Sequence, residues 1–423
     1  MVVKAALAVA IAVIVCGAMA VGASGNPDSQ RPAIVAMGDS FISGEGGGDY
    51  GDSGGGGCHR SSMAPIRSAP IAAVPINLAC TGAQTRNLWP SFLGGEWQRG
   101  EPPQADLLAA AARDNLVRLV VVTAGANDVG FGGIVARCAL DWARSDESDP
   151  RYCRADAQAE IAAALPAMQR GLARALHGVR MAMAASGYRR DDYRLLVMGY
   201  ASPFPPGRSI RYPEDGWSRL RKGGCPLWNR DADWAAGEAT PEIDAAMHRV
   251  ASEAGADFLD LRQAFEGHQL CDRRADPASA DAASAEWVRP LAFGPERTRE
   301  SLHPNAFGQP AIGACIALVF DRPRGDYACS GTPGRGYEDG MRLLSQVWAG
   351  TPSARPDDRR GRPPSPAARP SARGRAAPRT RPRPGARPLA RSHRRRPPRA
   401  PAAGRPGTRC VRGGSGCPRV PSR

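Results

Sequence analysis

Five short apolar segments, separated by helical patterns and turn residues, constrain the fold of this 423-residue chain more than any other feature. They span residues 33–37, 74–80, 116–123, 193–198 and 256–260. Between and after them, alanine-rich segments or apolar residues spaced three and four apart predict helices over residues 104–113, 155–186, 241–254, 305–319 and 336–348. Pro166 is expected to kink or split the helix over residues 155–186. Strands that alternate with helices predict a doubly wound α/β fold with a parallel sheet and right-handed crossovers.

The first apolar segment runs directly into the turn Gly38-Asp39-Ser40. A continuous apolar run bounded by turn residues is typical of a strand buried on both faces of a parallel sheet. Open α/β sheets bind ligands beyond the carboxyl ends of such strands, which makes Ser40 a candidate nucleophile. The alternative is an ordinary turn, since all three residues favour turns. The glycine-rich residues 44–58 that follow predict a mobile loop beside the serine.

The N-terminal segment has the composition of an export signal. Lys4 precedes a short apolar run over residues 5–15, and small residues follow it, which predicts a signal peptide over residues 1–23. The run is too short for a settled membrane anchor. A lipoprotein site at Cys16 is disfavoured because the large Val15 precedes it. We therefore expect a secreted protein whose catalytic domain covers residues 24–350.

The C-terminal segment carries the positive charge of the chain. Residues 351–423 hold 21 arginines, two acids and 16 prolines, so this segment contributes +19 and the remainder −4 to the formal net charge of +15. Such a composition predicts a disordered tail. It would attract anionic lipids or wall polymers without specificity, but a solvated tail without a dedicated partner is the favoured interpretation. Specific nucleic-acid binding is not expected, because no aromatic residue is interleaved for stacking.

Eight cysteines lie between these terminal segments: Cys58, Cys80, Cys138, Cys153, Cys225, Cys271, Cys315 and Cys329. An even number in an exported chain predicts disulfides, although eight cysteines allow 105 pairings. Pairing in sequence order is preferred, because each pair then flanks a loop-like stretch. A metal site is disfavoured, because no Cys-x-x-Cys pair or matching histidine spacing is present. We expect neither a metal nor an organic cofactor.

A serine nucleophile needs a base, and His303 is the distinctive candidate among six histidines. Pro304 biases it away from helical geometry and starts the following helix, which would aim the imidazole out of the sheet edge. Glu300, by its carboxylate or its backbone carbonyl, is the candidate that orients the other ring nitrogen. For a developing oxyanion, Ser40 N–H, Gly82 N–H and the Asn127 side chain are the candidate donors. Alone, Gly82 and Asn127 would be read as turn residues.

These four blocks resemble the SGNH hydrolase superfamily, the GDSL-type esterases and lipases. Gly38-Asp39-Ser40, Gly82, Gly125-Ala126-Asn127-Asp128 and His303-Pro304 occur in the family's order over residues 34–319. The resemblance implies a flavodoxin-like, three-layer α/β/α fold with a central parallel sheet. It also implies Ser40 as nucleophile, His303 as general base, and Ser40, Gly82 and Asn127 as the oxyanion hole.

The chain departs from the family pattern in two places. Phe41 replaces the leucine of the family name, and Glu300 stands where the family usually has aspartate. The sequence Cys58-His59-Arg60-Ser61 and the cysteine order are similar to secreted actinobacterial-type members, some of which use a backbone carbonyl in place of the acid. Those members usually have three disulfides, so Cys315–Cys329 would be an addition.

The predicted function is a secreted, monomeric serine esterase or lipase acting on an acyl ester, a lipid or an acylated glycan. The α/β-hydrolase alternative is excluded because its Gly-x-Ser-x-Gly elbow would need glycine at Ile42. Two further alternatives remain open: an acyltransferase that uses the same residues, and a non-catalytic cell-surface binding protein on a degenerate hydrolase fold.

Overall fold

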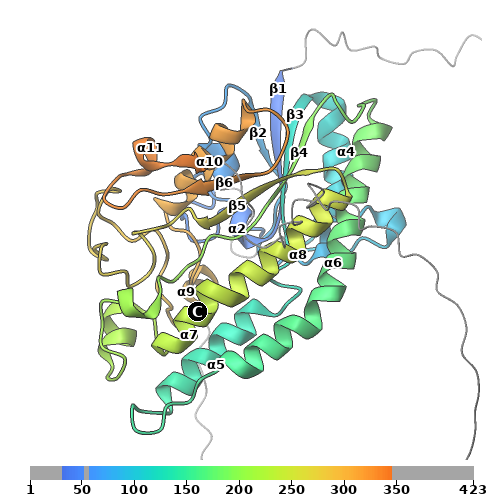
Figure 1. Cartoon of the computed structure of the whole chain (residues 1–423). Coiled ribbons are helices and arrows are strands. Elements are labelled where there is room, and N and C mark those ends of the chain that lie inside the picture. Colours follow the sequence, from blue (N-terminus) through green and yellow to red (C-terminus); the bar gives the residue numbers. More distant parts are fainter. Residues whose placement is uncertain (1–30, 52–56, 345–423) are drawn as a thin grey trace, which may run out of the picture. The chain divides into compact units, whose positions relative to one another are not determined.

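The computed structural model describes residues 31–51 and 57–344, and a seven-stranded sheet in the order β2-β1-β3-β4-β5-β6-β7 forms its centre (Figure 1). All neighbouring strands are parallel except β6 and β7. The strands are β1 Pro32–Gly38, β2 Val74–Asn77, β3 Leu116–Thr123, β4 Arg194–Met198, β5 Asp257–Gln263, β6 Tyr327–Ser330 and β7 Arg342–Leu344. The order of the first five is that of flavodoxin-like doubly wound folds.

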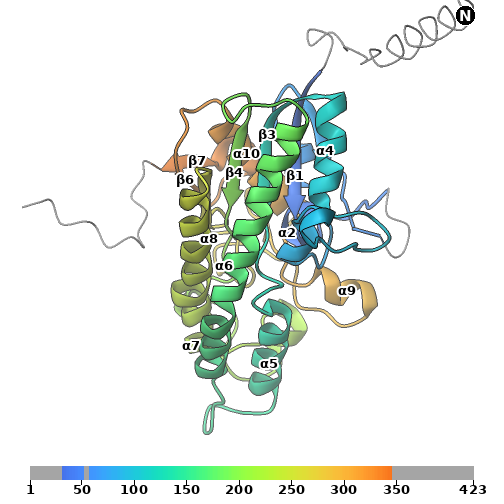
Figure 2. The ribbon, with the colours of Figure 1, turned by 90° about the vertical axis from the view of Figure 1, so that its right-hand side faces the viewer.

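Alternate side chains of the central strands enter two separate cores, one on each face of the sheet. In β1, Val35 and Met37 pack into the core beneath α4 (Gln104–Asp114), α6 (Arg154–Ala185) and α8 (Thr240–Glu253). Ile34 and Ala36 pack into the core beneath α3 (Pro65–Ser68) and α10 (Gly308–Phe320). Figure 2 shows α6 and α8 running along the first of these faces. A strand covered on both faces has to be apolar throughout, which explains the uninterrupted composition of residues 33–37.

The helices are α2 Ser40–Ser43, α3 Pro65–Ser68, α4 Gln104–Asp114, α5 Phe131–Ala143, α6 Arg154–Ala185, α7 Asn229–Trp234, α8 Thr240–Glu253, α9 Pro295–Glu300, α10 Gly308–Phe320 and α11 Tyr337–Gly340. Short helical turns are η2 Thr85–Leu88, η3 Ser91–Leu93, η4 Gly207–Ser209, η5 Arg219–Gly223 and η6 Ala235–Ala239. Among the described residues, none of the helices is long and apolar enough to cross a membrane.

The structure confirms the α/β class and the five predicted strands, and it corrects the C-terminal part. The helix predicted over residues 336–348 is wrong: only α11 is helical, and Arg342–Leu344 instead pairs with β6, while residues 345–348 lie outside the described part. The sheet is therefore not wholly parallel. Pro166 lies inside α6 without splitting it.

All four disulfides pair in sequence order, as predicted: Cys58–Cys80, Cys138–Cys153, Cys225–Cys271 and Cys315–Cys329. The predicted signal peptide (residues 1–23), the predicted tail (residues 351–423) and residues 52–56 of the glycine-rich loop lie outside the described residues.

Candidate active site

The turn after β1 fixes Ser40 at the carboxyl edge of the sheet. Gly38 has a φ of 142°, and a Cβ here would lie 1.9 Å from the carbonyl oxygen of Thr123, so only glycine fits against β3. The buried side-chain amide of Gln104 accepts a hydrogen bond from Gly38 N–H at 2.7 Å and donates one to Gly38 O at 2.9 Å. It thus makes the two backbone hydrogen bonds that a neighbouring strand would make. Asp39 then caps α2 by accepting Phe41 N–H at 3.0 Å, which leaves Ser40 as the first helical residue.

Ser40 and His303 lie within hydrogen-bond distance although 263 residues separate them in the sequence. The distance between Ser40 Oγ and His303 Nε2 is 2.7 Å, and that between His303 Nδ1 and the carbonyl oxygen of Ser301 is 3.1 Å. A carbonyl can only accept, so Nδ1 carries the proton and Nε2 is left to accept the Ser40 hydroxyl proton. The preceding Leu302 has a φ of 62°, a conformation uncommon outside glycine, in the turn that directs the imidazole to Ser40.

The surroundings of His303 favour a neutral imidazole. Burial lowers the pKa of His303 below its ordinary value, and the carboxylate of Glu45, the Ser301 carbonyl and the carboxylate of Glu300 offset this shift only in part. A histidine that is unprotonated near neutral pH can accept a proton, which is the state that a general base requires.

The structure does not bring the Glu300 carboxylate onto His303. Its Oε1 instead accepts a hydrogen bond from the Tyr50 hydroxyl at 2.7 Å, and that hydroxyl accepts from Gly46 N–H at 2.9 Å. Glu45, in the same loop, lies 3.1 Å from His59 Nδ1. The two carboxylates thus anchor the loop beside the site and act on His303 through their charge. The backbone carbonyls of Ser301 and Glu300 also raise the pKa of His303, and that of Ser301 lies 3.1 Å from Nδ1.

The three candidate oxyanion donors all follow strands that end at the same edge of the sheet. Asn127, after β3, donates from Nδ2 to the carbonyl oxygen of Ala83 at 2.9 Å, which ties it to the loop that contains Gly82. Gly82 has a φ of 77°, the left-handed region that favours glycine. The neighbouring Asp128 holds this arrangement by accepting from Thr85 N and Oγ1 at 3.0 and 2.6 Å.

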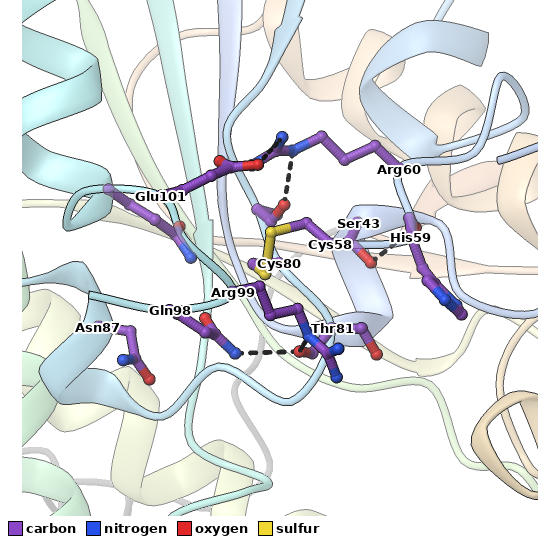
Figure 3. Close-up of a disulfide and its surroundings, with 12 residues drawn as sticks. Ser43, Cys58, His59, Arg60, Cys80, Thr81, Asn87, Gln98, Arg99 and Glu101 are labelled. Atoms are coloured by element: carbon purple, nitrogen blue, oxygen red, sulfur yellow. Dashed lines mark hydrogen bonds and ion pairs between the residues drawn. A yellow bond between two sulfur atoms is a disulfide. The ribbon is translucent and has the colours of Figure 1, made fainter. Parts of the chain in front are cut away.

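A disulfide and an arginine support the backbone that leads to Gly82, and Figure 3 shows both beside Cys80 and Thr81. Cys58–Cys80 ends two residues before Gly82. Arg60 donates to both carboxylate oxygens of Glu101 at 2.8 and 2.6 Å and, through Nε, to the carbonyl oxygen of Ala79 at 2.9 Å. These contacts fix the backbone on the approach to Gly82.

Tyr200, which sequence reasoning missed, connects the nucleophile turn to the Asn127 turn. Its hydroxyl donates to Asp39 Oδ2 at 2.6 Å and accepts from Ala126 N–H at 3.0 Å. Burial raises the pKa of Asp39 to about 7, and the Tyr200 hydrogen bond lowers it in part. A tyrosine two residues past β4 was the available signal, because strand ends in such sheets gather at the ligand site.

A cleft of about 280 Å³ opens beside the nucleophile, and it is called the outer cleft below. Ser40, Asn127 and His303 line it together with Tyr200, whereas its remaining walls are mostly apolar. Among the residues described, no group of three or more His, Cys, Asp or Glu side chains could hold a metal ion. The arrangement offers a hydroxyl nucleophile, an adjacent base and amide donors beside an apolar cleft, which is the equipment for acyl transfer.

Comparison with known proteins identifies the family of the chain. The sequence model of the GDSL-like Lipase/Acylhydrolase family matches residues 36–311. A lipase of Streptomyces rimosus is 28% identical over 289 residues, which cover 67% of this chain and 84% of the relative. Lipase 1 of Streptomyces coelicolor is 26% identical over 303 residues, which cover 70% of this chain and 91% of the relative.

Among solved structures, the extracellular lipase of Streptomyces rimosus aligns with 66% of this chain and 94% of its own, at 25% identity and a TM-score of 0.44. The family match spans well over half of this chain and includes Ser40, Gly82, Asn127 and His303. The chain belongs to the GDSL-like lipase/acylhydrolase family and is a carboxylic ester hydrolase.

Proposed function

We propose that this enzyme hydrolyses carboxylic esters through an acyl-enzyme on Ser40. His303 Nε2 takes the Ser40 hydroxyl proton while Oγ attacks the carbonyl carbon, and the same imidazole then gives that proton to the departing alcohol. Water, deprotonated by His303, attacks the acyl-enzyme next, and the carboxylic acid leaves as the Ser40 hydroxyl is restored.

The 2.7 Å distance between Ser40 Oγ and His303 Nε2, on the wall of an apolar cleft, is the observation that carries this proposal. Backbone N–H groups of Ser40 and Gly82 and the amide of Asn127 are proposed to hold the oxyanion. Each such donor is typically worth about 3–4 kcal/mol of transition-state stabilisation. The Ser301 carbonyl, rather than the Glu300 carboxylate, is proposed to orient His303, because it is the group facing Nδ1.

We further propose that the enzyme acts outside the cell. Four disulfides in the described residues support this, since disulfides persist in oxidising compartments and are rare in reducing ones. The signal-like composition of residues 1–23 points the same way.

Hydrolysis of p-nitrophenyl butyrate by Ser40→Ala and His303→Ala tests the mechanism. Both variants should lose at least about 10³-fold in kcat while far-ultraviolet circular dichroism stays unchanged. Ser62→Ala is the matched control, because Ser62 is exposed and lies outside the cleft. Substantial turnover by Ser40→Ala would refute the assignment.

A further inference from the structure

A pocket lined by three tryptophans lies at the carboxyl end of α5, and it is called the tryptophan pocket here. Its volume is about 180 Å³, and Trp142, Trp217 and Trp228 form its aromatic walls. Of the residues described, none lines both this pocket and the outer cleft. Helix α5 joins the two places, because its first residue, Phe131, lines the cleft and Trp142 lies in its last turn. Figures 1 and 2 show that helix beyond the carboxyl ends of the strands.

Hydrogen bonds fix two of these indoles and engage their only polar groups. Trp142 Nε1 donates to the carbonyl oxygen of Glu214 at 2.8 Å, and Trp228 Nε1 donates to Ser145 Oγ at 3.2 Å. Both rings are buried, and an indole has no acceptor and no second donor. Trp142 and Trp228 thus offer a ligand only aromatic surface.

Trp217 completes the walls, and it is 51% exposed. Its ring stands at 82° to that of Trp142, with centroids 6.0 Å apart, so the two rings form a nearly perpendicular corner. The guanidinium carbon of Arg221 lies 5.6 Å from the Trp217 centroid, although Arg221 is not among the described residues that line the pocket. Aromatic faces attract cations through their quadrupole, and that of tryptophan does so most strongly. The Trp217 ring therefore already contacts one positive group and also contributes surface to the pocket.

Negative charge lies beside the aromatic corner. Asp146 and Asp215 line the pocket, and none of its described lining residues is basic. Hydrogen bonds from Ser148, above all from its hydroxyl, lower the pKa of Asp146 below its ordinary value, so this carboxylate is charged at neutral pH. Helix α5 ends at Ala143 in the pocket wall, and the carboxyl end of a helix carries partial negative charge. The electrostatics of the pocket therefore favour a cation.

We propose that the tryptophan pocket binds a small organic cation of the alkylammonium class. Its alkyl groups contact the rings of Trp142 and Trp217, and the carboxylates of Asp146 and Asp215 balance its charge. Aromatic cages recognise quaternary ammonium groups because the ring faces attract the charge that the alkyl groups spread over their surface. A neutral sugar, which also stacks on tryptophan, fits less well, because its hydroxyl groups need donors as well as acceptors and carboxylates only accept. The site goes beyond the proposed function, since binding there needs neither Ser40 nor the rest of the outer cleft.

The test compares choline with its neutral isostere 3,3-dimethylbutan-1-ol, in which carbon replaces the ammonium nitrogen. The full chain, with isotope-labelled tryptophan, is titrated at constant ionic strength, and the indole N–H signals of its eight tryptophans are followed by nuclear magnetic resonance. We expect saturable shifts that include the Trp217 signal, which is identified by its absence in Trp217→Ala. The dissociation constant for choline should be on the order of 1 mM, and the isostere should bind at least about fivefold more weakly.

Trp217→Ala should raise that dissociation constant at least about fivefold and Asp215→Asn at least about twofold. Both replace exposed side chains, so circular dichroism should stay unchanged. Trp97→Ala is the matched control, because Trp97 is 65% exposed, lies outside the pocket and should leave the choline affinity unaltered.

Three results would overturn the inference: no saturable shift with choline, whether or not glucose binds, equal affinity for the isostere, or unaltered choline affinity in both pocket variants. Ser40→Ala should bind choline as the wild type does. A failed esterase assay would therefore refute the proposed function without touching the choline result.

Discussion

Replacing Tyr200 by phenylalanine removes one hydroxyl and keeps the ring. That hydroxyl joins Asp39 Oδ2 and Ala126 N–H, the residues next to Ser40 and Asn127. The ring itself packs edge to face on Phe41, with centroids 5.3 Å apart, and this contact should persist in the variant. The substitution therefore tests the link between the nucleophile turn and the oxyanion turn.

The magnitude follows from the two groups that lose their partner. A buried polar group left unpaired costs about 1–3 kcal/mol. Asp39 is 1% exposed and pays most of this cost, whereas Ala126 is only half-buried and water can replace part of its hydrogen bond. We expect the free energy of unfolding to fall by about 2–4 kcal/mol. The Tyr200 hydrogen bond lowers the pKa of Asp39, so the loss should be larger at pH 8 than at pH 5.

Urea denaturation under non-reducing conditions, with kcat/KM for butyrate ester measured in parallel, provides the assay. Tyr188→Phe is the matched control, because the Tyr188 hydroxyl also bridges two backbone groups, Asn115 O and Val117 N, away from the cleft. Both variants should lose stability, but only Tyr200→Phe should lose activity, by about tenfold or more. Equal activity in the two variants, or a stability loss below about 1 kcal/mol for Tyr200→Phe, would refute the reasoning.

Three further expectations can be measured with the same assays. Glu300→Gln should keep the hydrogen bond from Tyr50 and reduce kcat less than about tenfold, against at least about 10³-fold for His303→Ala; equal losses would make the carboxylate the essential orienter. Gln104→Ala should lower the free energy of unfolding by about 1–3 kcal/mol in urea, because the buried Gly38 N–H loses its acceptor while Gly38 O keeps the hydrogen bond from Cys80 N–H; an unchanged midpoint would contradict this. The pKa of Asp39 is raised to about 7 in the folded protein, so the stability gained from its protonated form is complete below about pH 4 and is lost as the pH rises toward 7. Asp39→Asn should therefore make the free energy of unfolding less dependent on pH between about pH 4 and 7. An unchanged pH profile in this variant would argue against the raised pKa.

Local sequence was enough to predict which candidate residues follow the strands. Ser40, Gly82 and Asn127 each lie within five residues of the end of a strand, and parallel topology brings the carboxyl ends of strands to one edge. The disulfide pairing was predictable for a similar reason, since each bridge closes a local loop.

Features that depend on tertiary contacts could not be predicted in the same way. The pairing of Tyr200 with Asp39 spans 161 residues, and no periodicity encodes it. Glu300 has the family's spacing from His303, yet its carboxylate is taken by Tyr50 from a glycine-rich loop. Residues 342–344 have a composition compatible with the end of a helix, and only the exposed edge of β6 makes them a strand.

Covalent labelling tests the central claim most directly. The enzyme is incubated with a fluorophosphonate, digested, and the modified residue is located by tandem mass spectrometry. The proposed dyad predicts one adduct per chain on Ser40, formed together with the loss of esterase activity, and no adduct in His303→Ala on the same time scale. Full activity after stoichiometric labelling of Ser40, or loss of activity with the adduct on another residue, would contradict it.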